Sequence, residues 1–163
     1  MKKRGKTNIL FVCTGNVFRS MSAEYCLRKY LNDNEIKNVF VASVGTEAKP
    51  QKPEKDVFEK LKQLGINPTK HKQIKLNKNH FKKFDLIVAM SNEHKRFAFT
   101  HFKKNIHLFN KICYDKNSSI KDVWEAVPNP NKHPKKKRKQ MRKTIKYINK
   151  SIPKFAKNYK YFL

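Results

Sequence analysis

Acidic residues are scarce in this chain, and so are cysteines. Only 12 Asp and Glu stand against 39 Lys and Arg, which gives a formal net charge of +27. The three cysteines are too few and too scattered for the disulfide framework of a small secreted protein, and no two have the close spacing of a zinc-ligand pair. We therefore expect free thiols, no metal, and a reducing location, the cytoplasm.

Long apolar runs are also absent. Apolar residues make up 38% of the chain, and they gather in short stretches at residues 9–12, 39–42 and 86–90 that have the character of buried strands. A membrane-spanning helix needs about 18 or more consecutive apolar residues, so none is expected. The length of 163 residues suits one hydrophobic core, and we expect a single domain over residues 1–163.

Positive charge is plentiful, and it is densest near the end of the chain. Residues 126–163 contain no acidic residue, and the basic run 135–139 begins an expected long helix. Such a basic C-terminal helix suits nucleic acid, anionic lipid or an acidic protein partner. The alternative is a lysine-rich composition throughout the chain, with a solvated helix face. In either case the field raises the local concentration of anionic substrates.

Apolar strands alternate with helical patterns along the chain. Strands are expected at residues 8–13, 39–43, 84–90 and 106–108, helices at 20–31, 54–64, 92–102 and 134–152, and a loop at 112–132. This alternation predicts an α/β fold in which helices cover both faces of a parallel sheet. Ligands bind such sheets beyond the carboxyl ends of the strands, and Cys13 ends the first strand.

The segment between the first strand and the first helix has the features of an anion-binding loop. Its residues are Cys13, Thr14, Gly15, Asn16, Val17, Phe18, Arg19 and Ser20. Backbone N–H groups and a helix N-terminus favour an anion there, and Gly15 permits an unusual backbone conformation. Arg19 adds a planar fork for two phosphate oxygens, and Ser20 is suited to cap the helix and donate to a thiolate.

Cys13 is the candidate nucleophile of this loop. A thiol that accepts a phosphoryl group has to be a thiolate at neutral pH, which requires positive surroundings. The plainer alternative is a small buried residue that ends a strand. The position of Cys13 between an apolar strand and an amphipathic helix, with Arg19 close behind it, favours the nucleophile.

Residues 13–20 resemble the signature loop of the low-molecular-weight protein tyrosine phosphatases. Further matches lie, in the expected order, at residues 21–24, 42–46, 71–81, 84–90 and 127–130. The resemblance spans about residues 7 to 152. It implies a three-layer α/β sandwich with a four-stranded parallel sheet, and it implies neither a cofactor nor a metal.

The resemblance also implies a reaction, the hydrolysis of phosphotyrosine or a similar ester in a protein or a small molecule. Cys13 would attack phosphorus and form a cysteinyl-phosphate, while Arg19 and the loop N–H groups stabilise the oxygens, and water would release inorganic phosphate. Asn16, Ser20, Ser43 and His71 would hold the loop in shape. Taken alone, without the resemblance, Ser43 and His71 would more often be hydrogen-bonded structural polar residues.

One departure concerns the general acid, an Asp-Pro pair in the family. This chain has Asn129-Pro130 at that place, and an amide cannot protonate a leaving group. General acid–base catalysis typically raises a rate by about 10²–10⁴-fold. The chain is then a weakened phosphatase, or it uses Glu125, Asp122 or His133 instead, or Asn129 is engineered, or the matched segment is a plain loop. Residues 131–132 are not aromatic, so no ring is expected there to flank a tyrosine.

Three other functions remain open from the sequence. A catalytically impaired protein that binds phosphorylated ligands would explain Asn129. An arsenate reductase would need further cysteines to resolve its intermediate, and none lies between Cys26 and Cys113. A basic nucleic-acid-binding protein would explain the charge, although no recognised nucleic-acid motif accompanies it.

Overall fold

The computed structural model describes residues 5–163, so the first four residues of the expected 1–163 domain lie outside it. Its elements are β1 (Thr7–Cys13), α1 (Arg19–Asp33), β2 (Val39–Gly45), α2 (Lys55–Gln63), α3 (His80–Lys83), β3 (Leu86–Ala89), α4 (Asn92–Phe102), β4 (His107–Leu108), α5 (Phe109–Tyr114), α6 (Val123–Ala126), η1 (Pro130–Lys132), α7 (Pro134–Asn158) and η2 (Tyr159–Phe162).

The strands form one parallel sheet in the order β2-β1-β3-β4. The expected four-stranded parallel sheet is therefore confirmed. Cys13 at the end of β1 pairs with Gly45 at the end of β2, so the first and second strands finish side by side. The chain that follows β1 begins at this carboxyl edge of the sheet, which is where parallel sheets bind ligands.

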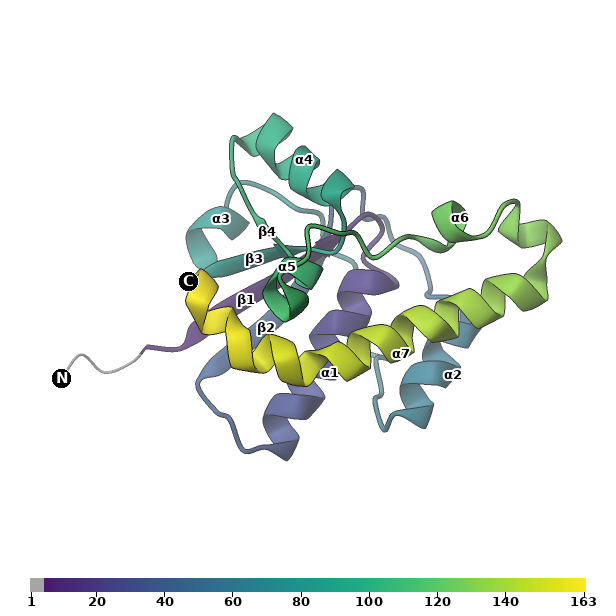
Figure 1. The fold of residues 1–163 in the computed structure, drawn as a ribbon, viewed down its shortest axis with the longest axis horizontal. Helices are drawn as coiled ribbons and strands as arrows, with labels where there is room; N and C mark the ends of the chain where they lie inside the picture. Colours follow the sequence, from purple (N-terminus) through teal and green to yellow (C-terminus); the bar gives the residue numbers. More distant parts are fainter. Residues whose placement is uncertain (1–4) are drawn as a thin grey trace.

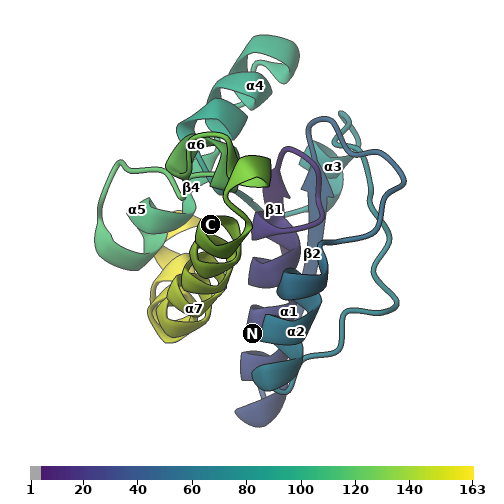
Figure 2. The same cartoon turned by 90° about the vertical axis from the view of Figure 1, so that its right-hand side faces the viewer.

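β1 lies inside the sheet because both of its faces are apolar. Ile9 and Phe11 belong to a core shared with α1 and α7, whereas Leu10 and Val12 belong to a second core shared with α4. All four side chains are fully buried. Figures 1 and 2 show α4 on one side of the sheet and α1 and α7 on the other, which confirms the three-layer arrangement.

α7 is longer than the sequence predicts. Its apolar residues recur every three or four positions, from Met141 through Ile145, Ile148 and Ile152 to Phe155, and all five are buried. The expected end at residue 152 is wrong, because the exposed Pro153 lies inside the helix without stopping it. Burial of the face beyond the proline outweighs the loss of one backbone donor.

The interpretation of residues 112–132 as a loop is also wrong in part. The end of α5, all of α6 and all of η1 lie within this range. α6 has only four residues, too few to show a helical period, yet Val123 is buried and a capping box starts the helix. In that box the Asp122 carboxylate accepts the Glu125 N–H, and the Glu125 carboxylate accepts the Asp122 N–H at 3.1 Å. The Asp122 carboxylate also accepts the Trp124 N–H at 3.3 Å.

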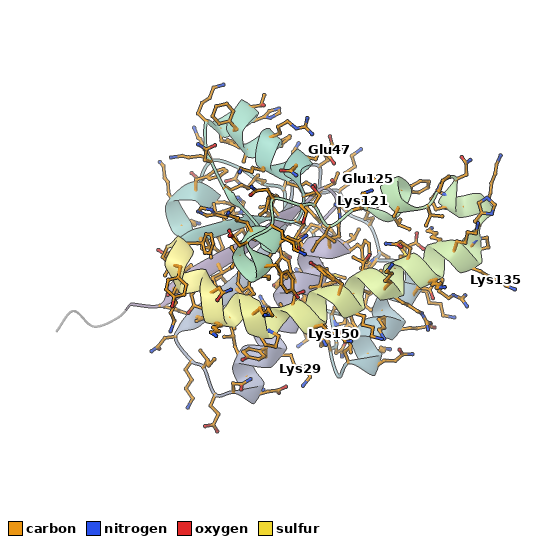
Figure 3. The ribbon with its side chains drawn as sticks, viewed as in Figure 1. Lys29, Glu47, Lys121, Glu125, Lys135 and Lys150 are labelled. Atoms are coloured by element: carbon orange, nitrogen blue, oxygen red, sulfur yellow. The ribbon has the colours of Figure 1, made fainter. Side chains whose placement is uncertain are left out.

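The solvent-exposed face of α7 carries much of the positive charge of residues 126–163. Exposed lysines follow the helical period along it; these are Lys135, Lys139, Lys143, Lys146, Lys150, Lys154 and Lys157. Figure 3 labels Lys135 near the start of α7 and Lys150 farther along the same helix. The expected nucleic-acid or acidic partner stays a prediction. No helix in residues 5–163 is long and apolar enough to cross a membrane.

Candidate active site

A cleft of about 590 Å³ opens at the carboxyl end of β1. Its floor is the loop that joins β1 to α1, and its walls come from three other segments. The lining residues are Cys13, Thr14, Gly15, Val17, Phe18, Arg19, Gln51, Lys52, Pro53, Glu54, Val57, Asp122, Val123, Trp124 and Met141. The loop that the sequence predicts as a phosphate site thus faces a cavity large enough for a small phosphate ester.

The Cys13 thiol lies at the bottom of the cleft and is 3% exposed. Its Sγ is 2.9 Å from the Ser20 Oγ on the first turn of α1. Asn16 adopts a left-handed conformation with φ of 57°, and its Nδ2 donates to Ser20 at 3.0 Å and to Ser43 at 2.8 Å. The sequence-predicted residues Cys13, Asn16, Ser20 and Ser43 therefore form one connected network.

The network continues to Glu24, which the sequence analysis did not single out. The Ser43 hydroxyl donates to the Glu24 carboxylate, which also pairs with Arg28 at 2.6 Å. Burial raises the pKa of Glu24, against the hydrogen bond from Ser43 and the charge of Arg28, which lower it. A signal was available, because Glu24 lies one helical turn after Ser20 and so shares its face of α1.

These hydrogen bonds determine which group donates and which accepts at each contact in the network. Glu24 accepts the proton of Ser43, so the Ser43 oxygen accepts from Asn16, and Asn16 uses its other amide hydrogen on Ser20. The Ser20 hydroxyl proton is then free for the sulfur of Cys13 at 2.9 Å or the Val44 carbonyl at 3.3 Å. The network leaves Ser20 as a donor next to the thiol.

His71 supports the same loop from outside. Its Nε2 donates to the backbone carbonyl of Asn16 at 2.7 Å, and its Nδ1 is 3.8 Å from the Glu24 carboxylate. Burial lowers the pKa of His71, against the hydrogen bond to Asn16, which raises it. The Ile74 N–H donates to the Asn16 side-chain oxygen at 3.1 Å. Both ends of the Asn16 amide and its carbonyl are thus occupied, which fixes a strained residue.

Gly45 allows β2 to approach the loop. A Cβ atom at this position would lie 2.4 Å from the Thr14 carbonyl oxygen and 3.0 Å from the Asn16 nitrogen. Its own backbone is occupied by hydrogen bonds to residues 74 and 76. Only glycine fits here without moving the loop, which explains the Gly in the matched stretch at residues 42–46.

Arg19 is 1% exposed although it carries a full charge. One guanidinium nitrogen donates to the Ile120 carbonyl at 2.9 Å, and the other donates to the Asp122 carboxylate at 2.8 Å. Both partners come from the segment before α6, which lies opposite the loop. The fork of Arg19 therefore joins the two sides of the cleft.

Asn129, expected at the general-acid position, does not line this cleft. Its side chain is exposed, and its backbone adopts φ of 48° at the start of η1. The lining carboxylates are those of Asp122 and Glu54, and Glu54 is paired with Lys137 at 2.6 Å. Glu125 caps α6, and His133 is exposed at the start of α7. Of the three alternative acids, the cleft contains Asp122.

Trp124 supplies an aromatic ring that the sequence analysis did not place. It is 59% exposed and lines the cleft two residues after Asp122. Lys137 lies over it, with its Nζ 5.9 Å from the ring centroid. Val57 and Met141 add apolar surface to the same cavity. Residues 5–163 contain no cluster of three His, Cys, Asp or Glu side chains that would hold a metal ion.

A family model described as low molecular weight phosphotyrosine protein phosphatase matches residues 8–161. A relative with that name from Schizosaccharomyces pombe is 38% identical over 92 residues, 54% of this chain and 58% of the relative. A protein-arginine-phosphatase from Bacillus subtilis is 36% identical over 98 residues, 58% of this chain and 63% of the relative. An arsenate reductase from Staphylococcus haemolyticus is 34% identical over 88 residues, 54% and 63% of the two chains.

The chain therefore spans less than two thirds of the length of these curated relatives. Solved structures match over more of it. The crystal structure of a YwlE mutant from Bacillus subtilis has a TM-score of 0.79 and covers 95% of this chain and 99% of that one, at 24% identity. This likeness agrees with the three-layer fold.

Proposed function

Because the chain belongs to the low molecular weight phosphotyrosine protein phosphatase family, we propose that it hydrolyses phosphomonoesters through a cysteinyl-phosphate at Cys13. The observation that carries the proposal is the hydrogen-bonded arrangement of Cys13, Ser20 and Asn16 at the bottom of a cleft that also holds Arg19. A thiol beside a fixed donor, an anion-binding loop and a guanidinium fork is suited to phosphoryl transfer.

In the first step the Cys13 sulfur attacks phosphorus, and the bond from phosphorus to the ester oxygen breaks. The loop N–H groups and Arg19 bind the oxygens of the phosphoryl group in the transition state. In the second step a water oxygen attacks the same phosphorus, the sulfur–phosphorus bond breaks, and inorganic phosphate leaves. The Ser20 hydroxyl donates to the thiolate that is present before the first step and after the second.

We assign the general acid to Asp122 in place of Asn129. The support is that the Asp122 carboxylate lines the cleft and lies 2.8 Å from Arg19, whereas the Asn129 side chain is exposed. A bound phosphoryl anion competes with the Asp122 carboxylate for Arg19. Once released from Arg19, the Asp122 carboxylate takes up a proton from the bound phosphate monoanion and passes it to the leaving oxygen as the bond from phosphorus to oxygen breaks. In the second step the same carboxylate takes a proton from the attacking water.

Phosphotyrosine is the proposed substrate. Trp124, Val57 and Met141 give the cleft an aromatic and apolar wall of the kind that packs against a phenyl ring. This wall supplies the aromatic contact that residues 131–132 lack. The similarity to a protein-arginine-phosphatase makes phosphoarginine the alternative substrate to be tested.

Arsenate reduction is not favoured by the cysteines. The chemistry needs thiols that attack the intermediate, yet Cys26 and Cys113 are 1% and 3% exposed. Burial raises the pKa of Cys26 to about 12, and burial raises that of Cys113 to about 12 despite the charge of Lys154. Both stay protonated at neutral pH and are weak nucleophiles.

The test is steady-state hydrolysis of an activated aryl phosphate, a phosphotyrosine peptide and a phosphoarginine peptide, with the Cys13→Ser variant as the blank. We expect turnover of the first two and none in the blank. Faster turnover of phosphoarginine would replace the substrate assignment. If no ester turns over while inorganic vanadate still binds, the chain is the phospho-ligand binding protein that the sequence left open.

A further inference from the structure

A fully buried histidine contacts the residue that follows the nucleophile. His94 lies in the first turn of α4 and is 0% exposed, and its Nε2 is 2.9 Å from the Thr14 Oγ1. Thr14 lines the cleft directly after Cys13. Nothing in the mechanism above uses His94, and a buried imidazole needs a partner at each nitrogen.

The partners of His94 fix which nitrogen carries the proton. The Ser91 backbone N–H donates to Nδ1 at 3.1 Å, so Nδ1 is an acceptor. The pair forms a capping box, in which the Ser91 side chain accepts the backbone N–H of His94 in return. A neutral imidazole then holds its single proton on Nε2, and that proton points to Thr14.

His94 stays neutral over the working range of an enzyme. Burial, followed by the nearby charge of Arg19, lowers its pKa to about 3. The Nε2–H is therefore a donor at neutral pH. Protonation of Nδ1 would remove the acceptor on which the capping box depends.

The Thr14 hydroxyl still has its own proton available for a hydrogen bond. Its oxygen accepts from His94, so its own O–H has to point to a different acceptor, and residues 5–163 offer it no second hydrogen-bond partner. Thr14 is partly buried and lines the cleft, so its O–H is turned toward whatever fills the cleft, which is water in the free protein and an oxygen of a phosphoryl group when one is bound.

We propose that His94 is a positioning residue that makes the Thr14 hydroxyl an obligate donor to an oxygen of the bound phosphoryl group. The loop then offers a side-chain O–H in addition to its backbone N–H groups and the Arg19 fork. A hydrogen bond to a charged oxygen is stronger than a neutral one, and a preset donor avoids reorientation on binding. This inference rests on the proposed phosphate-binding function of the loop.

The experiment is a double-mutant cycle read by the dissociation constant of inorganic vanadate and by kcat/KM for an aryl phosphate. Thr14→Val removes the hydroxyl at constant shape and should weaken vanadate binding about tenfold. His94→Leu frees the hydroxyl to rotate and should weaken it about threefold to fivefold, while His94→Gln, which restores an N–H, should recover most of the loss. In the Thr14→Val background, His94→Leu should add less than about twofold.

Thermal unfolding is recorded for every variant, because His94 is buried. The exposed pair Thr100 and His101 on the same helix gives matched controls, Thr100→Val and His101→Leu, which should change neither readout. Equal effects of His94→Leu in both backgrounds would overturn the proposal, since the histidine would then act on stability alone. No effect of Thr14→Val would overturn it too.

Vanadate binding and ester turnover together distinguish failure of the proposed function from failure of the His94 assignment. If the chain turns over no ester, the proposed function fails, but the vanadate cycle still decides whether His94 acts through Thr14. If esters turn over normally in Thr14→Val while vanadate binding is unchanged, the proposed function stands and the His94 assignment is withdrawn.

Discussion

The two sides of the cleft are held in place very differently. On the loop side, Asn16, Ser20 and Ser43 are at most 3% exposed, and each contacts at least one other member of a network that ends at Glu24. On the opposite side, Trp124 is 59% exposed and α6 has only four residues. The loop is held by a buried polar network, whereas the proposed acid, Asp122, starts a four-residue helix whose Trp124 is exposed.

This difference bears on the proposal that Asp122, and not residue 129, is the general acid. The loop geometry depends on many buried contacts, so each loop position accepts few residue types. The segment at residues 120–124 is held by two hydrogen bonds to Arg19, by a hydrogen bond from the Ile120 N–H to the Met90 carbonyl at 2.9 Å, and by one short capped helix. Ile120 and Val123 of this segment are buried in the core.

The largest effect should come from the one residue that joins the two sides. Arg19→Lys keeps the charge but loses the planar fork that meets Ile120, Asp122 and the ligand, and kcat should fall by about 10²–10³-fold. The measurement is kcat for an activated aryl phosphate, with the exposed Arg96→Lys on α4 as a control that should behave as the native chain. A loss of less than about threefold would mean that charge alone suffices.

The acid assignment gives the next largest effect. Asp122→Asn removes the transferable proton but keeps the shape, and hydrolysis of a phosphotyrosine peptide should slow by about 10²-fold. An activated aryl ester with a good leaving group should lose much less, because its leaving oxygen needs little protonation. The ratio of the two rates is the measurement. Equal losses on both substrates would show that Asp122 acts by holding Arg19 and not as an acid.

The loop side could be predicted from the sequence because its parts are close together or follow local rules. Cys13, Asn16, Arg19 and Ser20 lie within one strand–loop–helix unit, whose anion-binding geometry is a property of backbone and helix end. The sheet followed from the alternation of apolar strands and amphipathic helices. Ser43 came from the family resemblance, and the structure brings it to Asn16.

The acid side could not be predicted in the same way. Asp122 is 103 residues from Arg19, and no spacing rule links the two. The sequence analysis named Asp122 only as one of three alternatives to Asn129, and its Asp-x-x-Glu capping box could be recognised there. The burial of Val123 and the contact of Asp122 with Arg19 become visible only in three dimensions. His94 was missed for a similar reason, since its partner Thr14 is 80 residues away.

Stability should depend on pH through His94, which belongs to the buried side. Its pKa is about 3 in the folded chain and ordinary when unfolded, so the unfolded state gains the proton first as pH falls below about 6.5. The free energy of unfolding should fall by about 2 kcal/mol more between pH 7 and pH 5 than in His94→Gln. Urea unfolding at both pH values measures this, and identical falls would contradict the buried neutral histidine.

The smallest effect should come from Asn129→Asp, and it bears most directly on the comparison between the two candidate acids. An Asp at this exposed position outside the cleft has no path to the leaving oxygen, so peptide hydrolysis should stay within about twofold of the native rate. The informative form is the double variant Asp122→Asn with Asn129→Asp. If the new carboxylate restored the rate, the segment at residues 127–130 would have to reach the cleft during turnover, and the acid would belong where the motif match placed it. If the rate stays as low as in Asp122→Asn alone, the position of the carboxylate beside Arg19 matters, and a match to the Asp-Pro motif by residue type alone does not identify the acid in this chain.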